Sequence, residues 1–251
     1  MKTVKLFTLV PLLAVAACSS GNTGQVSFSV TSRSATTAPA ASAVFAASAP
    51  LAAGATAACG GTSLTDGTNT LCITSVELVL KQVELKRADA AACDAIPDNG
   101  DCEEFESGPV LVSLPLGSLV TMATVTVKEV PNGLYNEIEF EIHKVGATEA
   151  AALNFPAGIS IRVRGVYNAN PAFEFTSDLD VSEEVMLTNP LSVSGGQANI
   201  DLRVDISSWF KSAGGTLMDP ATADPSVVAN NIKASFHAFE DDNHDGLDDS
   251  K

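Results

Sequence analysis

Positive charge is scarce in this chain. It holds 14 Lys and Arg against 30 Asp and Glu, which gives a formal net charge of −16 over 251 residues. A surface of that sign repels the phosphates of nucleic acids and anionic lipid headgroups, so we exclude both as electrostatic partners. The surplus of carboxylates fits instead a domain that lies outside the cytoplasm and collects divalent cations.

The signatures of common enzymes are also missing. The sequence contains no G-x-S-x-G, H-E-x-x-H or glycine-rich phosphate-binding loop. Its three histidines, His143, His237 and His244, stand in no recognisable motif with Cys or Ser. The sequence therefore predicts no catalytic constellation, and we expect a protein that is not an enzyme.

No apolar run is long enough for a comfortable transmembrane helix. The first one follows Lys2 and Lys5 and extends from Leu6 to Ala17, which is the pattern of an export signal. It closes with Val15-Ala16-Ala17-Cys18, which resembles the lipobox of bacterial lipoproteins. The resemblance implies cleavage before Cys18, with lipid on its sulfur and on its new amino group. A plain signal peptide with a chance cysteine is the alternative.

Residues 1 to 17 are thus expected to be a signal peptide, and residues 18 to 24 a lipid-anchored tether. Cleavage would remove two lysines and change the net charge from −16 to −18. Each buried methylene contributes about 0.8 kcal/mol, so several acyl chains hold a protein firmly. Because Ser19 and Ser20 rather than Asp follow Cys18, we expect an outer-membrane lipoprotein of the bacterial cell envelope, facing the periplasm or the cell surface.

Four further cysteines, Cys59, Cys72, Cys93 and Cys102, form the even set that is typical of disulfides in exported proteins. A zinc site is the alternative, but the chain has no C-x-x-C pair and few histidines. Residues 72 to 87 resemble one long strand, or two in line, at about 3.3 Å per residue, which separates Cys72 from Cys93. We predict the pairs Cys59–Cys72 and Cys93–Cys102.

Alternating apolar and polar residues dominate the chain from 25 to 239. This pattern predicts a mainly β domain, an antiparallel β-sandwich with a short C-terminal helix. A shift in the alternation predicts a β-bulge near Lys81-Gln82, and Pro131-Asn132-Gly133 predicts a turn. The expected strands cover residues 25–32, 72–87, 110–114, 125–127, 138–142, 159–163, 173–175 and 198–206.

Two segments depart from this pattern. Residues 33 to 58 are rich in Ala, Ser and Thr and lack large side chains, which indicates a flexible excursion; an Ala-rich helix is the alternative. Near the C-terminus, Asp224 as N-cap and Pro225 at the first helical position begin the predicted helix. Its apolar face has four residues at helical spacing: Val228, Ile232, Phe236 and Phe239.

The acidic tail from 240 to 251 carries the sharpest motif, because residues 241 to 249 fit the D-x-[DN]-x-D-G spacing of calcium loops. The motif resembles thrombospondin type 3 and dockerin half-loops, with the preceding helix as the entering helix. The expected ligands are the side chains of Asp241, Asn243, Asp245 and Asp249 and the carbonyl of Leu247. The usual bidentate Glu at loop position 12 is missing, so we expect weak calcium binding. A solvated acidic tail is the alternative.

Four segments, residues 24–30, 73–85, 108–114 and 130–138, resemble the bacterial lipoproteins of domain of unknown function 4382. The match covers roughly residues 24 to 145, extends more loosely to about residue 206, and rests on strands and turns. It implies an extracytoplasmic β-sandwich of the transthyretin or immunoglobulin type and supplies no catalytic residue. The Ala-rich excursion and the four cysteines depart from the family pattern.

Two other features are candidate sites. Glu137, Glu139 and Glu141 share one strand face, where they form a catalytic pair, a cation site or simply the wet face of a sheet. Trp209-Phe210 is either a sugar-stacking platform or, as we expect, a hydrophobic plug.

The sequence thus favours a lipid-anchored, non-enzymatic binding or structural module of the cell envelope, with an unknown protein or polysaccharide partner. One alternative is an extracytoplasmic hydrolase of polysaccharide or peptide that uses Glu137 and Glu139 as acid and base. Another is a carrier of a small apolar ligand in the interior of the domain.

Overall fold

The computed structural model describes residues 23–33, 59–88, 102–106, 108–116, 123–169 and 172–249. The expected signal peptide, Cys18, nearly all of the 33–58 excursion and Cys93 lie outside these ranges. Within them the chain forms mainly β-strands, which confirms the predicted class. No helix in this part of the chain is long and apolar enough to cross a membrane.

Most strands are followed directly by another strand, and only two helices interrupt this order in the described part of the chain. The strands are β1 (Thr23–Arg33), β2 (Thr62–Thr65), β3 (Thr70–Arg87), β4 (Cys102–Glu106), β5 (Val110–Ser113), β6 (Ala123–Pro131), β7 (Gly133–Ile142), β8 (Ile161–Tyr167), β9 (Ala172–Ser177), β10 (Val181–Val193), β11 (Gln197–Asp205) and β12 (Phe236–Glu240). The helices are α1 (Ala150–Leu153) and α2 (Pro225–Lys233).

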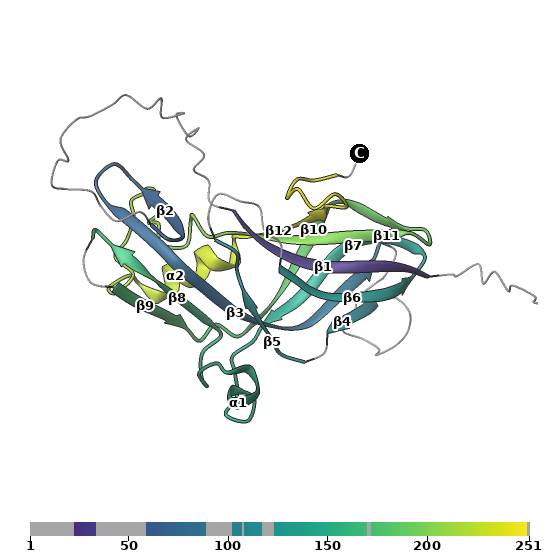
Figure 1. The fold of residues 1–251 in the computed structure, drawn as a ribbon, viewed down its shortest axis with the longest axis horizontal. Coiled ribbons are helices and arrows are strands. Elements are labelled where there is room, and N and C mark those ends of the chain that lie inside the picture. The colour runs from purple at the N-terminus through teal and green to yellow at the C-terminus, as the bar shows by residue number, and fades with distance from the viewer. Residues whose placement is uncertain are drawn as a thin grey trace, which may run out of the picture.

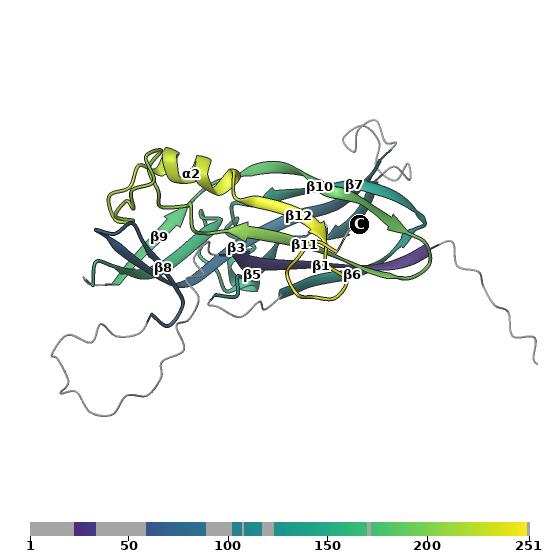
Figure 2. The same cartoon turned by 90° about the horizontal axis from the view of Figure 1, so that it is seen from above.

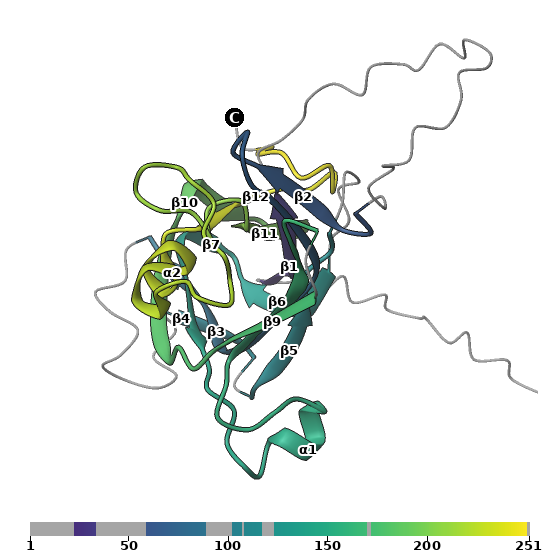
Figure 3. The same ribbon diagram turned by 90° about the vertical axis from the view of Figure 1, so that its left-hand side faces the viewer.

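The strands belong to one sheet with the order β6-β1-β11-β12-β10-β7-β3-β8-β9, while β2, β4 and β5 pair with the long strand β3. The sheet is strongly curled, so that β1 and β11 lie across from β3 and β7 (Figure 1). In an end-on view the strands surround an interior, in the manner of a half-barrel (Figure 3).

The arrangement of the strands differs from the prediction in two ways. The sheet is not purely antiparallel, because β1 pairs with β11 and β10 pairs with β12 in parallel. The predicted two-sheet sandwich is not confirmed, since β10 and β12 join both halves into one curled sheet. Alternation tells which side chains face the interior, but it carries no information on the neighbour or direction of a strand.

The interior is filled by side chains from both halves of the sheet. Val26, Phe28 and Val30 of β1 are buried, as the alternation predicted, and so are Phe140 on β7 and Phe236 on β12. The rings of Phe140 and Phe236 meet edge to face, with centroids 5.1 Å apart. Each such side chain contributes roughly 1.5–3 kcal/mol when it leaves water, so this cluster is the main source of stability.

Trp209 and Phe210 close one end of this core. Both are fully buried, which confirms the hydrophobic plug and excludes an exposed sugar-stacking platform at these residues. The Trp209 Nε1–H donates to Ser235 Oγ at 2.9 Å. The ring of Phe210 lies edge to face with Phe175, at 5.2 Å between centroids.

Three local predictions are confirmed. A register shift follows Lys81 in the pairing of β3 with β7, and Gln82 has a φ of 50°, so β3 carries the expected bulge. The chain turns at Asn132 between β6 and β7. Cys59 and Cys72 form a disulfide, with 5.7 Å between their Cα atoms. The second predicted pair involves Cys93 and therefore lies outside the described residues.

The C-terminal helix is shorter than predicted. Asp224 caps α2 by accepting from the Ser226 N–H, and Val228 and Ile232 face the core as expected. The prediction is wrong for Phe236 and Phe239, which lie on β12. Their helical spacing is a coincidence, because the two rings lie on opposite faces of the strand. Phe236 is buried in the core, whereas Phe239 lies on the other face, where the Arg203 guanidinium stacks 4.8 Å from its ring centre.

Candidate functional site

The C-terminal acidic loop follows β12 and lies against the outer face of the sheet (Figure 2). The Asp241 N–H donates to Asn199 O at 2.9 Å, which continues the pairing with β11. The Asp242 carboxylate accepts from the Asn199 N–H at 2.9 Å. The predicted entering helix is wrong, because the loop follows a strand.

The predicted calcium ligands hydrogen-bond within this loop. Asp241 accepts from the N–H groups of Asp245 and Gly246, at 3.0 and 2.7 Å. Asn243 Nδ2 donates to Asp249 Oδ1 at 2.8 Å. Gly246 has a φ of 76°, a conformation that glycine adopts without strain, so it permits the tight turn as predicted. Asp241 is fully buried, whereas the Leu247 side chain is exposed.

A second buried acid lies near this loop, and no sequence motif indicated it. Asp201 lies on the outer face of β11, between Ser29 of β1 and Phe239 of β12, and it is completely buried. Thr31 Oγ1 donates to Asp201 Oδ2 at 2.5 Å, while Asp201 Oδ1 has no hydrogen-bond partner among the described residues. Burial and, to a smaller extent, the charge of Asp241 raise the pKa of Asp201 to about 7, against the lowering effects of the Thr31 hydrogen bond and the Arg203 charge.

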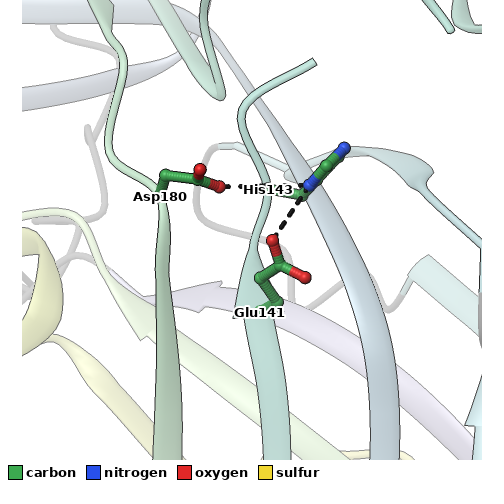
Figure 4. A group of neighbouring side chains, drawn as sticks. All are labelled: Glu141, His143 and Asp180. Atoms are coloured by element: carbon green, nitrogen blue, oxygen red, sulfur yellow. Dashed lines mark hydrogen bonds and ion pairs between the residues drawn. The ribbon is translucent and has the colours of Figure 1, made fainter. Parts of the chain in front are cut away.

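A second cluster of ionisable side chains lies at the end of β7 and is drawn in Figure 4. His143 Nδ1 faces Glu141 Oε1 at 3.0 Å and Asp180 Oδ1 at 4.0 Å. His143 Nε2 lies 2.9 Å from Glu149 Oε2. Glu141 belongs to β7, Asp180 immediately precedes β10, and Glu149 immediately precedes α1, so the fold brings together residues from three places in the sequence.

The surroundings of this cluster fix its geometry. The His143 N–H donates to Val79 O at 2.9 Å. The Lys144 N–H donates to Asp180 Oδ1 at 3.0 Å, and the Gly146 N–H donates to Glu149 Oε2 at 2.7 Å. Only 12% of the His143 side chain is exposed. Burial lowers the pKa of His143, but the hydrogen bonds to Glu141 and Glu149 outweigh it, so the pKa is raised.

Among the residues that the structure describes, Glu141, His143 and Asp180 are the one group of three acidic, His or Cys side chains whose ligand atoms all lie within 4.8 Å of one another. The carboxylates of the C-terminal loop do not converge to this extent. From the sequence, His143 was noticed only as an isolated histidine. The only sequence signal for this cluster was a histidine two residues after the strand glutamate Glu141. The sequence could not show that Asp180 and Glu149 lie beside this histidine.

The glutamate row on β7 is engaged in ion pairs with β3. Lys86 Nζ lies 3.1 Å from Glu137 Oε1, and Lys81 Nζ lies 3.9 Å from Glu141 Oε2. The arginines of β8 do not join this row. Arg162 and Arg164 instead contact Glu77 on β3, and Arg164 also contacts Glu174 on β9.

An open groove with a volume of about 370 Å³ and polar walls borders the C-terminal loop. It is lined by Gln25, Ser27, Gln197, Asn199, Asp242 and His244. These residues come from β1, β11 and the loop, so the groove lies on the outer face of the curled sheet, away from the apolar interior.

Comparisons with known proteins give no further assignment: no family model, no curated protein and no solved structure matches this chain.

Proposed function

We propose that this protein is a lipid-anchored module of the bacterial cell envelope, attached to the outer membrane through Cys18, with a binding or structural role rather than a catalytic one. The observation that carries the proposal is that strand β1 begins at Thr23, which is separated from Cys18 in the sequence by Ser19 to Asn22. At about 3.4 Å per residue, this connection spans at most roughly 17 Å, so a lipid on Cys18 would hold the sheet close to the bilayer.

The start of β1 also defines which end of the body would face the membrane. Thr23 pairs with Pro131 at the end of β6, and the Gln25 N–H donates to Gly196 O at 2.9 Å. The β6–β7 and β10–β11 turns therefore lie at the same end as the start of β1 (Figure 1). The β2–β3 hairpin and the Cys59–Cys72 disulfide would lie at the opposite end, available to a partner in the periplasm or outside the cell.

The packing of the interior favours a module over a carrier of an apolar ligand. Most of the buried apolar residues form one cluster across the half-barrel, and Val79, Val145 and Phe155 form a second, smaller one. The groove beside the C-terminal loop is open, polar and on the outer face, which suits contact with a protein or polysaccharide surface. The ion pair of Glu137 with Lys86 favours a structural role for the glutamate row over the hydrolase alternative, because an acid and a base need environments that separate their pKa values.

Membership of the lipoproteins of domain of unknown function 4382 is part of this proposal and rests on the strand and turn patterns of the sequence. So is weak calcium binding by the loop from Asp241 to Asp249. The buried carboxylates of Asp201 and Asp241 support a cation there, since two neighbouring buried acids are more favourable when a positive charge lies close to them. An affinity of about 10⁻⁴ to 10⁻³ M would suit an extracytoplasmic module.

Replacing Cys18 tests the anchoring. The Cys18→Ala variant should leave the membrane fraction or remain unprocessed, whereas the neighbouring Ser19→Ala variant should fractionate as the unaltered protein does. Metabolic labelling with a fatty acid should mark the unaltered chain and Ser19→Ala but not Cys18→Ala. Recovery of Cys18→Ala in the membrane fraction, in unchanged amount and size, would refute the proposal.

A further inference from the structure

We propose that Glu141, His143 and Asp180 bind a divalent transition-metal ion, and that Zn²⁺ is the cation that fits this site best. The inference is independent of the proposed function and of the C-terminal loop, which is elsewhere on the sheet. It rests on the convergence of one imidazole nitrogen and two carboxylate oxygens, all within 4.8 Å of one another.

The orientation of the His143 imidazole ring suits the binding of a cation by its Nδ1 atom. Glu149 Oε2, at 2.9 Å from Nε2, is an acceptor for a proton on that nitrogen. Nδ1 faces the oxygens of Glu141 and Asp180 (Figure 4), so a metal ion would replace the proton that Nδ1 shares with Glu141 when no metal is bound. A carboxylate behind a histidine is the arrangement that orients metal-bound imidazoles and increases their basicity. Glu149 is thus a positioning residue.

The distances require only small movements for an ion to enter. Zinc bonds of about 2.0–2.2 Å separate neighbouring ligand atoms by roughly 3.3–3.6 Å in a tetrahedral site. Glu141 Oε1, now 3.0 Å from His143 Nδ1, would move away by a few tenths of an ångström. Asp180 Oδ1, now at 4.0 Å from Nδ1 and hydrogen-bonded to the Lys144 N–H, would approach by about half an ångström, and its side chain is 54% exposed.

The charges favour a divalent ion of this class. One M²⁺ neutralises the carboxylates of Glu141 and Asp180, and Lys81 Nζ lies 3.9 Å from the other oxygen of Glu141. A mixed nitrogen and oxygen set with three protein ligands suits zinc, which would keep water at its fourth position on the exposed side of Asp180. Calcium fits poorly, because it requires six to eight oxygen ligands.

Isothermal titration of the purified full chain with ZnCl₂, in a millimolar excess of calcium that occupies oxygen-only sites, tests the proposal. We expect one zinc ion per chain. His143→Gln should abolish this binding, and Asp180→Ala should weaken it at least tenfold. The matched control Asp178→Ala removes the same charge two residues away and should leave the affinity unchanged. Glu149→Ala should weaken binding by about 10- to 100-fold through the loss of ring orientation.

Nitrogen NMR of the His143 ring distinguishes metal from proton. Zinc should shift the Nδ1 resonance of the unaltered protein and leave Nε2 protonated, and the shift should be absent in Asp180→Ala at the same zinc concentration. Thermal unfolding of each variant without metal shows whether it is folded. Absence of one-to-one binding in the folded unaltered chain, or equal weakening by Asp178→Ala and Asp180→Ala, would show that the cluster is only a proton-bridged ion pair and would overturn the proposal.

Discussion

Replacing Asp201 with Asn is expected to stabilise the protein above neutral pH. The carboxyl of Asp201 is completely buried, with Thr31 Oγ1 as its hydrogen-bond donor, and its folded-state pKa is about 7 against an ordinary value of 3.8. Asn has nearly the same shape and retains an oxygen that accepts from Thr31. The substitution therefore removes the cost of ionising a buried acid while it preserves the packing.

The expected size follows from this pKa difference. Between about pH 4 and pH 7 the folded chain holds one proton more than the unfolded chain, so the free energy of unfolding falls by about 1.4 kcal/mol per pH unit. Three units give a loss of about 4 kcal/mol that is complete above pH 7, and none below pH 4. Both side chains leave one polar atom without a partner, so this cost roughly cancels in the comparison. Asp201→Asn should thus match the unaltered protein near pH 4 and exceed it by up to about 4 kcal/mol at pH 8.5.

Urea unfolding at pH 4.5, 6.5 and 8.5 provides the measurement. Glu137→Gln is the control for net charge, since it also neutralises one buried carboxylate of this acidic chain. It should be destabilised at pH 8.5 by about 1–3 kcal/mol, because Lys86 loses its partner. A stability difference between Asp201→Asn and the unaltered protein that is the same at pH 4.5 and 8.5 would refute the reasoning. So would stabilisation of both variants at pH 8.5, which would indicate a general effect of net charge.

Three further predictions concern the anchor, the disulfide and the tail. Trp209 is the only tryptophan, and fluorescence energy transfer from it to a dansyl-labelled lipid headgroup should be weak. Transfer should become strong in a Trp209→Phe chain that carries Leu134→Trp at the other end of the sheet. Equal transfer in the two proteins would contradict the proposed orientation. Joint replacement of Cys59 and Cys72 by Ala should lower the free energy of unfolding by about 3 kcal/mol, as measured in urea, for a separation of 13 residues; an unchanged midpoint would argue against the bond. Millimolar calcium should slow amide exchange in β12 and the tail, and Asp245→Ala should abolish this protection; an equal response in both proteins would leave a solvated tail.

Local features of the fold were predictable because each depends on residues that are close in the sequence. The alternation of Val26, Phe28 and Val30 identified the inward face of β1, since successive side chains of a strand point to opposite sides. The bulge at Gln82 was visible as a change of phase in the same alternation. Asp224 followed by Pro225 marked the beginning of α2 for equally local reasons.

The neighbours and directions of strands could not be predicted, because they depend on the path of the whole chain. The parallel pairing of β1 with β11 has no counterpart in the pattern of either strand. Strand β10 was missed because Pro190 interrupts it, at the point where its register with β7 shifts. Strand β12 was assigned to a helix because Phe236 and Phe239 happen to continue the spacing of α2.

The candidate sites show the same division. The loop from Asp241 to Asp249 was predictable as a motif, because all of its residues are consecutive. The cluster around His143 was not, since Asp180 reaches it from the connection between β9 and β10. Sequence spacing identifies sites that lie on one element, whereas this cluster depends on which elements the curled sheet brings together.

The two outward-facing acids Glu137 and Asp201 show why facing alone does not determine the role of a residue. Both occupy polar positions of an alternating strand, and both are buried. Glu137 lies beside Lys86 of the neighbouring strand, and the hydrogen bond between them raises the pKa of that lysine. Asp201 accepts a hydrogen bond from Thr31 and lies near the charge of Arg203, but burial outweighs both and raises its own pKa. Neutralising the first acid leaves a cation without its partner, whereas neutralising the second removes a buried charge that its neighbours compensate only in part. The opposite signs expected for Glu137→Gln and Asp201→Asn thus follow from the cross-strand neighbour, which the pairing of the strands determines.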